Sequence, residues 1–135
     1  MNSHLLQKLR NKAVLNPPAS TDEIEKFCIW ARIRPDHPFL VAWLEFNGFD
    51  EKDTMISLWP LSEIMEVNIA FDSNSIAIAD VLIYSHNYYV MLGDSSAPVI
   101  EKDSQKAVAI SLEDFLEKVA RGDFDNSQYG IIDVA

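Results

Sequence analysis

One stretch decides the fold of this chain, Pro38-Phe-Leu-Val-Ala-Trp-Leu-Glu-Phe-Asn-Gly48, in which only Glu45 and Asn47 are polar between the proline and the glycine. Proline suits the first position of a helix, and glycine adopts the left-handed conformation that ends one at no steric cost. An apolar stripe runs along this helix and is widened by the remaining apolar residues. The residues of the stripe itself are Phe39, Leu40, Trp43 and Leu44. The stretch therefore predicts a helix over 38–48 that other elements cover on more than one side.

Capping residues predict two further helices. Ser20 and Glu23 form an S-x-x-E capping box before apolar residues with helical spacing. Ser111 and Asp114 make a second capping box before the last helix, and Gly122 is placed to end that helix.

A turn over residues 32–37 joins the first of these helices to the buried one, so the two are expected to form a hairpin. Asp36 or His37 is placed to cap the buried helix. Capping is also the expected role of His37, because no serine or cysteine nucleophile sits in a recognisable motif. Cys28 lies on the apolar face of the first helix and is predicted to be a small core residue.

The middle of the chain predicts short strands. Alternating or apolar residues indicate strands within 54–58, 76–92, 98–101 and 106–110, joined by short turns. Within 76–92 two alternatives stay open: a hairpin that bends near residues 80–85, or one strand with a bulge. The fold class is therefore expected to be α+β, with helices packed on an antiparallel sheet of about four to six strands.

The ends of the chain are expected to differ from the domain between them. Residues 1–16 are predicted as an N-terminal arm or short helix that packs weakly, 17–121 as the domain, and 122–135 as an extension that packs on it or frays. The first residues lack the long apolar run of a signal peptide or membrane span. A single cysteine fits a reducing compartment, so a cytoplasmic location is expected.

The composition is acidic, with a net charge of -10. This negative charge is repelled by a nucleic-acid backbone and by an anionic membrane surface, so neither is expected as a partner. Between residues 53 and 101 the acidic residues have no Lys or Arg among them. They are Asp53, Glu63, Glu66, Asp72, Asp80, Asp94 and Glu101. This segment predicts either a solubilising surface or a docking face for a basic partner.

The sequence shows no pattern typical of an enzyme. Its histidines, His4, His37 and His86, lie far apart beside scattered carboxylates. The acidic turn at 50–53 lacks the glycine and the distal glutamate of a calcium loop. We therefore expect no catalytic residues, no metal ligands and no cofactor.

A protein partner is the remaining expectation, with charges that guide its approach and aromatic side chains that anchor it. The candidate partner-binding residues are Asp50, Glu51, Asp53, Asp80, Tyr84, His86 and Tyr88. The alternative is that the tyrosines line the core and the acids only keep the protein dissolved. We expect a monomer or a weak homodimer.

Several short motifs follow one another in a definite order over residues 17–121. They are Pro-Pro-Ala-Ser-Thr-Asp-Glu-Ile-Glu at 17–25, Phe46-Asn47-Gly48, Leu58-Trp59-Pro60-Leu61-Ser62-Glu63-Ile64, a run of strands, and Ser111-Leu112-Glu113-Asp114-Phe115-Leu116. In this order the chain resembles the SUKH superfamily and, within it, the Smi/Knr-like family. It departs from the family at 81–86, where members often have a glycine-rich or acidic turn.

The resemblance implies an α+β fold, an antiparallel sheet with helices packed on it. It also implies a function, because many bacterial members are immunity proteins that bind and neutralise polymorphic or contact-dependent toxins, often nucleases. The expected partner is then a basic toxin domain. The alternative that the resemblance leaves is a general scaffold or regulatory interaction domain without a toxin partner.

Overall fold

A computed structural model describes residues 1–68, 75–81, 86–93, 98–101 and 107–123 of the chain. The helices are α1 Ser3–Lys12, α2 Thr21–Ala31, the short 3-10 helix η1 Pro38–Leu40, α3 Val41–Glu45, α4 Leu61–Val67 and α5 Leu112–Arg121. The strands are β1 Ala13–Leu15, β2 Phe49–Glu51, β3 Ile56–Leu58, β4 Ser75–Val81, β5 His86–Met91, β6 Val99–Glu101 and β7 Ala107–Ala109.

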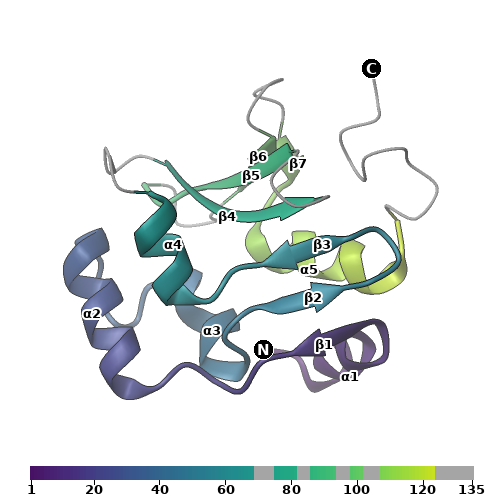
Figure 1. Ribbon diagram of the computed structural model, residues 1–135, viewed down its shortest axis with the longest axis horizontal. Helices are drawn as coiled ribbons and strands as arrows, with labels where there is room; N and C mark the ends of the chain where they lie inside the picture. The colour runs from purple at the N-terminus through teal and green to yellow at the C-terminus, as the bar shows by residue number, and fades with distance from the viewer. Residues whose placement is uncertain (69–74, 82–85, 94–97, 102–106, 124–135) are drawn as a thin grey trace.

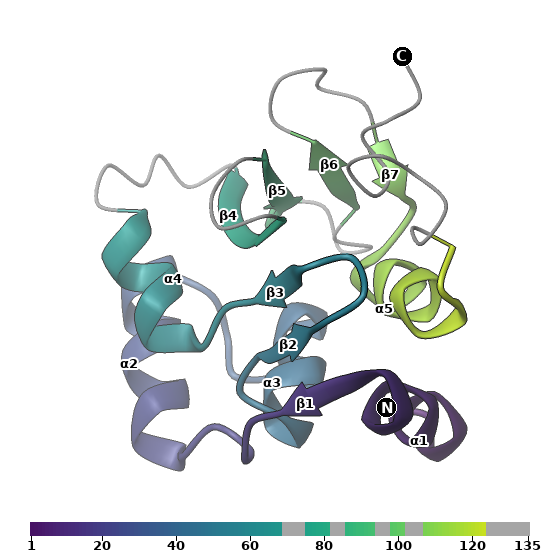
Figure 2. The same cartoon turned by 45° about the vertical axis from the view of Figure 1, so that its right-hand side comes forward.

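The strands form one antiparallel sheet in which each strand pairs with its neighbours in sequence, in the order β1-β2-β3-β4-β5-β6-β7. The predicted α+β class is confirmed, with seven strands in place of the expected four to six. Figure 1 shows α1, α3 and α5 behind β1 to β3, and Figures 1 and 2 both show α2 and α4 together at one end of these strands. No described helix covers the opposite face of β1 to β3, which we call the open face. None of the described helices has the length and apolar character needed to cross a membrane.

The strand register sorts side chains between the two faces of the sheet. One row crosses β1 to β6 and consists of Leu15, Phe49, Leu58, Ala79, Tyr88 and Glu101. It faces the helices, because Tyr88 packs against Phe115 of α5 with ring centroids 5.4 Å apart. The neighbouring row consists of Val14, Asp50, Ser57, Asp80 and Asn87. Since successive side chains of a strand alternate, this second row belongs to the opposite face.

The central helix is shorter than the sequence predicts. It runs through η1 and α3 and ends at Glu45, because Phe46 already has an extended backbone with φ of -155°. Gly48 has φ of +90° but lies beyond the helix, so its predicted role as the helix stop is wrong. Leu44 is 54% exposed, so the apolar stripe is also narrower than expected. The side chains buried in this stretch are Phe39, Leu40, Ala42, Trp43 and Phe46.

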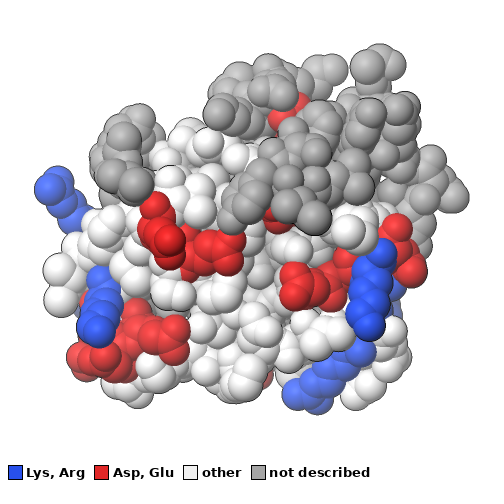
Figure 3. Space-filling model, in the orientation of Figure 1, with Lys and Arg blue, Asp and Glu red and all other residues white. Residues whose placement is uncertain are grey.

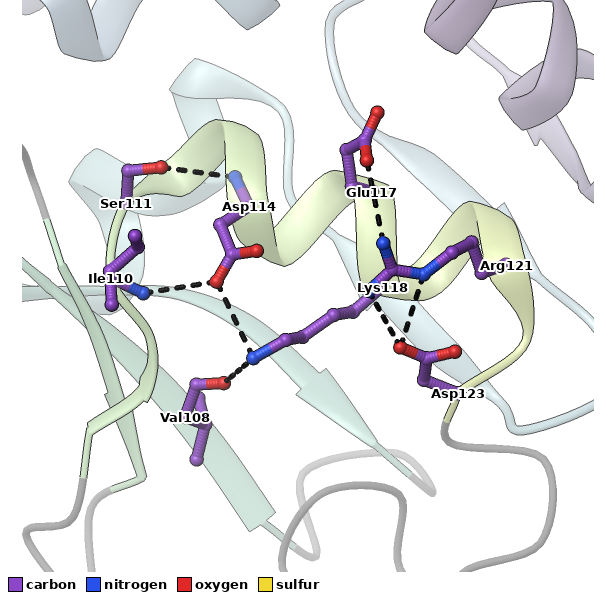
Figure 4. A network of polar contacts seen from close by, with 8 residues as sticks. All are labelled: Val108, Ile110, Ser111, Asp114, Glu117, Lys118, Arg121 and Asp123. Atoms are coloured by element: carbon purple, nitrogen blue, oxygen red, sulfur yellow. Dashed lines mark hydrogen bonds and ion pairs between the residues drawn. The ribbon is translucent and has the colours of Figure 1, made fainter.

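The predicted capping box of α2 is confirmed in full and that of α5 in part, because the Asp114 carboxylate accepts the amide of Ile110 and not that of the N-cap residue Ser111. Ser20 and Glu23 make a complete capping box at the start of α2. At the start of α5, the Ser111 hydroxyl accepts the Asp114 amide at 3.0 Å, and Gly122 ends the helix with φ of +75°. Figure 4 shows how Lys118 then ties α5 to β7: its ammonium donates to the Val108 carbonyl at 2.9 Å and lies 3.4 Å from the Asp114 carboxylate.

The N-terminal residues are an integral part of the fold. Leu5 and Leu9 of α1 are 1% and 0% exposed, and α1 packs against α5. β1 follows directly and pairs with β2. Of the two alternatives predicted for residues 1–16, the short helix is therefore present, but the expected weak packing is wrong, because these residues supply both a core helix and the first strand of the sheet. The predicted extension at 122–135 falls almost wholly on 124–135, which lie outside the described residues.

The open question at residues 76–92 is answered by the pairing of two strands. β4 and β5 pair antiparallel, so the chain reverses between Val81 and His86 as a hairpin. The register also shifts between Ala77 and Ala79, which places a bulge inside β4. Both features that the sequence left as alternatives are therefore present, at different positions.

Asn47 connects three of the sequence motifs. Its backbone N–H donates to the Pro17 carbonyl at 2.8 Å, and its carbonyl accepts the Asn16 side chain at 2.8 Å. Its Nδ2 donates to the Glu23 carboxylate at 2.9 Å, and its Oδ1 accepts the Leu61 amide at the start of α4, also at 2.9 Å. The motifs at 17–25, 46–48 and 58–64 thus meet at one junction, where they hold the fold together.

This junction predicts a pH dependence of stability. The Ser20 amide donates to the Glu23 carboxylate and is the main cause that lowers the pKa of this carboxyl below its ordinary value of 4.5. Because the folded pKa is lowered, the stabilisation is present above pH 4.5 and is lost as pH falls through the folded value. We expect Glu23→Gln to lower the free energy of unfolding at pH 7 and to cost less at pH 3.

Urea unfolding of the parent and of Glu23→Gln at both pH values measures this difference. Glu25→Gln is the matched control, since Glu25 is exposed on the same helix and has the same charge. A cost of Glu23→Gln that stays the same at pH 7 and pH 3 would contradict the prediction.

Candidate functional site

The structure divides the predicted partner-binding residues between surface and core. Asp50 and Asp53 are exposed, whereas Glu51, Asp80 and Tyr88 are only 2%, 4% and 0% exposed. Tyr84 lies outside the described residues. His86 begins β5 opposite Val81, and its side chain is likewise outside the described part. The set therefore does not form one surface patch, as far as the structure describes it.

Tyr88 is a core residue, and its predicted role as a surface anchor is wrong. The strand register aligns it with Ala79 of β4 and Glu101 of β6 on the helical side of the sheet. There its ring packs against Phe115. Side chains alternate between the two faces along β5, but alternation alone does not tell which face is covered.

Glu51 shapes a turn and is not available to a partner, which corrects its place among the surface candidates. Its carboxylate accepts the backbone N–H groups of Asp53 and Thr54 at 2.8 and 2.9 Å, and also the Thr54 hydroxyl. It thereby closes the β2–β3 connection, in which Met55 has φ of +63°. Asp53 stays on the surface, with its side chain 69% exposed, and pairs with Lys12 at 3.2 Å.

A hollow of about 300 Å³ opens beside the strands of the open face. We call it the acidic pocket, and its lining includes Asp50, Ser57, Trp59, Pro60, Glu63 and Asp80. Asp50, Ser57 and Asp80 come from β2, β3 and β4 and lie opposite one another in the register. Glu63 comes from the first turn of α4. Among the described lining residues, none is Lys or Arg.

Hydrogen bonds hold the walls of this pocket. The Trp59 indole N–H donates to the Asp80 carboxylate at 3.1 Å, and the Ser57 hydroxyl donates to Asp50 at 2.7 Å. Trp59 is itself held, because its carbonyl accepts the Trp43 indole N–H at 2.9 Å and its amide donates to Ile78 at 2.9 Å. Trp59 and Asp80 are therefore tied to each other and, through Trp43 and Ile78, to the core of the protein.

Figure 3 views the molecule from the side of the open face and shows acidic side chains on β2 and α4, with basic side chains toward the margins. The exposed or half-buried acids here are Asp50, Asp53, Glu63 and Glu66. Asp80 and Glu101, counted among the acids of the middle segment, are buried. Among the described residues, fewer acids of this segment therefore reach the surface than the sequence suggests, and Asp50 and Glu63 are the surface acids that line the pocket.

Sequence reasoning missed part of this pocket. Asp50 and Asp80 were named as candidates, whereas Ser57, Trp59 and Glu63 were not. In the sequence, Trp59 and Glu63 stand out as members of the motif at 58–64, and Glu63 also as one of the acids of the middle segment, but neither is marked as part of a site. The signal that unites them is the register of β2, β3 and β4, which a single sequence does not contain.

The residues that invite a catalytic interpretation have other contacts. Burial raises the pKa of the Cys28 thiol, which disfavours the reactive thiolate. The Nδ1 of His37 accepts the Phe39 amide at 3.0 Å as the predicted cap, so its Nε2 carries the proton toward the Leu92 carbonyl, 3.2 Å away. Within the described part of the chain, no three His, Cys, Asp or Glu side chains gather in a way that could hold a metal ion.

A second hollow, of about 170 Å³, lies on the helical side between α3 and the start of α5. Its lining is mainly apolar and includes Met1, Pro38, Val41, Leu112 and Leu116. Ser111 and Glu113 are its polar lining residues, and the Ser111 hydroxyl is already engaged as the cap of α5. The acidic pocket is therefore the stronger candidate site.

Comparisons with known proteins identify no relative: no protein-family model and no curated protein matches the chain.

Proposed function

We propose that this chain is a non-enzymatic protein-binding module, an immunity protein of the SUKH type that neutralises a basic bacterial toxin domain. The observation that carries the proposal is the open face of the sheet, which bears the acidic pocket and has no described helix over β1 to β3. The resemblance of the motifs over 17–121 supplies the toxin as the expected partner. The acidic net charge supports a partner of opposite sign.

In this proposal the exposed acids and the buried Asp80 have separate roles. Asp50 and Glu63 stand where their charge reaches solvent and attracts a basic surface. Such attraction raises association rates by about 10-fold to 1000-fold at low salt. Asp80 is too buried for its charge to attract a basic surface from a distance, but a donor that enters the pocket would meet its carboxylate. The surface acids are therefore expected to set how fast the complex forms, and the pocket how long it lasts.

The test is to co-express the chain with the basic domain encoded beside it in the source genome and to measure inhibition and binding. We expect a complex, loss of the toxin's activity, and association about 10-fold faster or more at 0.05 M than at 0.5 M salt. Asp50→Asn combined with Glu63→Gln should slow association at low salt. The matched control, Glu25→Gln with Glu45→Gln, removes two exposed charges from α2 and α3.

Two results would count against this function. A complex without any loss of toxin activity would favour the scaffold or regulatory domain instead. Equal association rates at both salt concentrations, or equal slowing by both double variants, would remove the acidic open face as the attracting surface.

A further inference from the structure

Asn47 and Gly48 form the only Asn-Gly pair of the chain, because the other glycines follow Leu92, Arg121 and Tyr129. In such a pair the backbone nitrogen of the glycine can attack the side-chain Cγ of the asparagine, since glycine has no Cβ to hinder the approach. A bond forms between this nitrogen and Cγ, the bond from Cγ to Nδ2 breaks, and ammonia leaves with the proton of the backbone amide. Water then opens the cyclic imide at one of its two carbonyls, which leaves aspartate or isoaspartate at position 47.

The fold holds the atoms that this reaction must move. The Asn47 Nδ2 donates to the Glu23 carboxylate at 2.9 Å, and Oδ1 accepts the Leu61 amide at 2.9 Å. The backbone is held as well, since the Gly48 carbonyl accepts the Asn16 amide at 3.1 Å. Turning the carboxamide toward the Gly48 nitrogen therefore requires that both of its hydrogen bonds break. The folded state should slow the attack for this reason.

The product of the reaction does not fit the contacts of the parent side chain. Glu23 is charged at neutral pH, because the Ser20 amide lowers the pKa of its carboxyl. An aspartate at position 47 has no donor for this carboxylate and places a second negative charge beside it. Isoaspartate also lengthens the backbone by one atom before Gly48, which passes so close to the Leu58 carbonyl that a Cβ has no room.

We propose that Asn47-Gly48 is a deamidation site masked by the fold: the chain is modified when the junction around Asn47 opens, and the modified chain no longer closes it. The junction joins the segments at 17–25, 46–48 and 58–64, so its loss affects the whole domain. Water is the only co-reactant. Chemical modification of the opened chain thereby turns a reversible unfolding into an irreversible one.

Peptide mass spectrometry of the full chain tests the masking. The protein is incubated at one mildly alkaline pH and one temperature, either folded or unfolded in urea, and the peptide that contains Asn47-Gly48 is followed over time. We expect the amide to be replaced by the acid about 10-fold faster or more in the unfolded chain. Equal rates in the two states, or faster modification of the folded chain, would overturn the proposal.

Three variants test whether the product fits the junction. Asn47→Asp makes the modified side chain directly, and Asn11→Asp is the matched control, which adds the same charge at an exposed position of α1. We expect Asn47→Asp to lower the urea concentration at the midpoint of unfolding by about 1 M or more, and Asn11→Asp to leave it nearly unchanged. Adding Glu23→Gln to Asn47→Asp should restore part of the loss, because the new glutamine amide donates to the new carboxylate.

This rescue separates a specific clash from a general loss of stability, since Glu23→Gln alone is expected to be destabilising. A double variant that loses the sum of its two single costs would remove the Glu23 contact as the reason for the block. An Asn47→Asp protein as stable as Asn11→Asp would show that the deamidated chain still folds, and the proposal would be wrong. If Asn47→Asp does not fold at all, the rescue and the rate comparison in the parent chain still decide.

Discussion

Replacing Trp43 with alanine is expected to lower the free energy of unfolding by about 3 to 5 kcal/mol, the usual cost of deleting a large buried aromatic side chain. Trp43 is fully buried and stacks on Phe39, with ring centroids 4.5 Å apart. Phe39 stacks in turn on Phe27 of α2, so one aromatic column joins α2 to η1 and α3. Urea unfolding followed by circular dichroism measures the change.

The loss should exceed the burial term alone, because the Trp43 indole N–H donates to the Trp59 carbonyl at 2.9 Å. Without the indole, the buried Trp59 carbonyl beside the acidic pocket loses this hydrogen bond. Leu44→Ala is the matched control: it deletes a large apolar side chain from the next position of the same helix, where that side chain is 54% exposed. We expect it to cost less than about 1 kcal/mol. Similar losses for both variants would contradict the assignment of the core.

The sequence identified the helices that have strong local signals. Ser20 with Glu23, and Ser111 with Asp114, lie at the starts of α2 and α5 because a side-chain cap is a local interaction between residues three apart. The length of the central helix was misjudged for the opposite reason. Phe46 and Asn47 leave the helix to make contacts with distant residues, and tertiary contacts override the local preference of an apolar stretch.

Two short strands show no clear strand pattern in the sequence, each for a different reason. β2 was read as a charged turn, since its sequence is Phe49-Asp50-Glu51. In the fold, Asp50 points to the open face and Glu51 closes the following turn, so both charges have a place in a strand. β1 has only three residues directly after a helix, which is too short for any periodic pattern to indicate a strand.

The candidate site could be predicted only in part. The sequence shows that acids dominate the middle of the chain, but it does not show which of them reach the surface. The register places Asp80 beside Ser57 and Asp50 and also sends Tyr88 into the core. That register depends on the β4 bulge and on pairings between distant segments. These long-range features explain why the composition shows the excess of acidic residues but does not show which side chains, such as that of Tyr88, are buried.

Gly48→Ala is the second change with a large expected effect, because two independent costs meet at this residue. Gly48 has φ of +90°, a conformation that side chains with a Cβ rarely adopt. Such strain costs about 1 to 3 kcal/mol. A Cβ atom here would also lie 2.4 Å from the Leu58 carbonyl oxygen and 2.9 Å from the Pro60 nitrogen, both backbone atoms that cannot rotate away. Moving packed atoms costs about another 1 to 3 kcal/mol.

The expected loss for Gly48→Ala is therefore about 2 to 6 kcal/mol in the free energy of unfolding. The close approach has a structural reason, since Asn47 next to it bonds the first amide of α4, and only a bare backbone lets the chain pass over the end of β3. Gly93→Ala is the matched control, because a Cβ there meets nothing within 4 Å. It should change stability by less than about 1 kcal/mol. Urea unfolding of both variants decides the matter: a Gly48→Ala protein as stable as Gly93→Ala would mean that β3 and the Asn47 junction do not approach as closely as described.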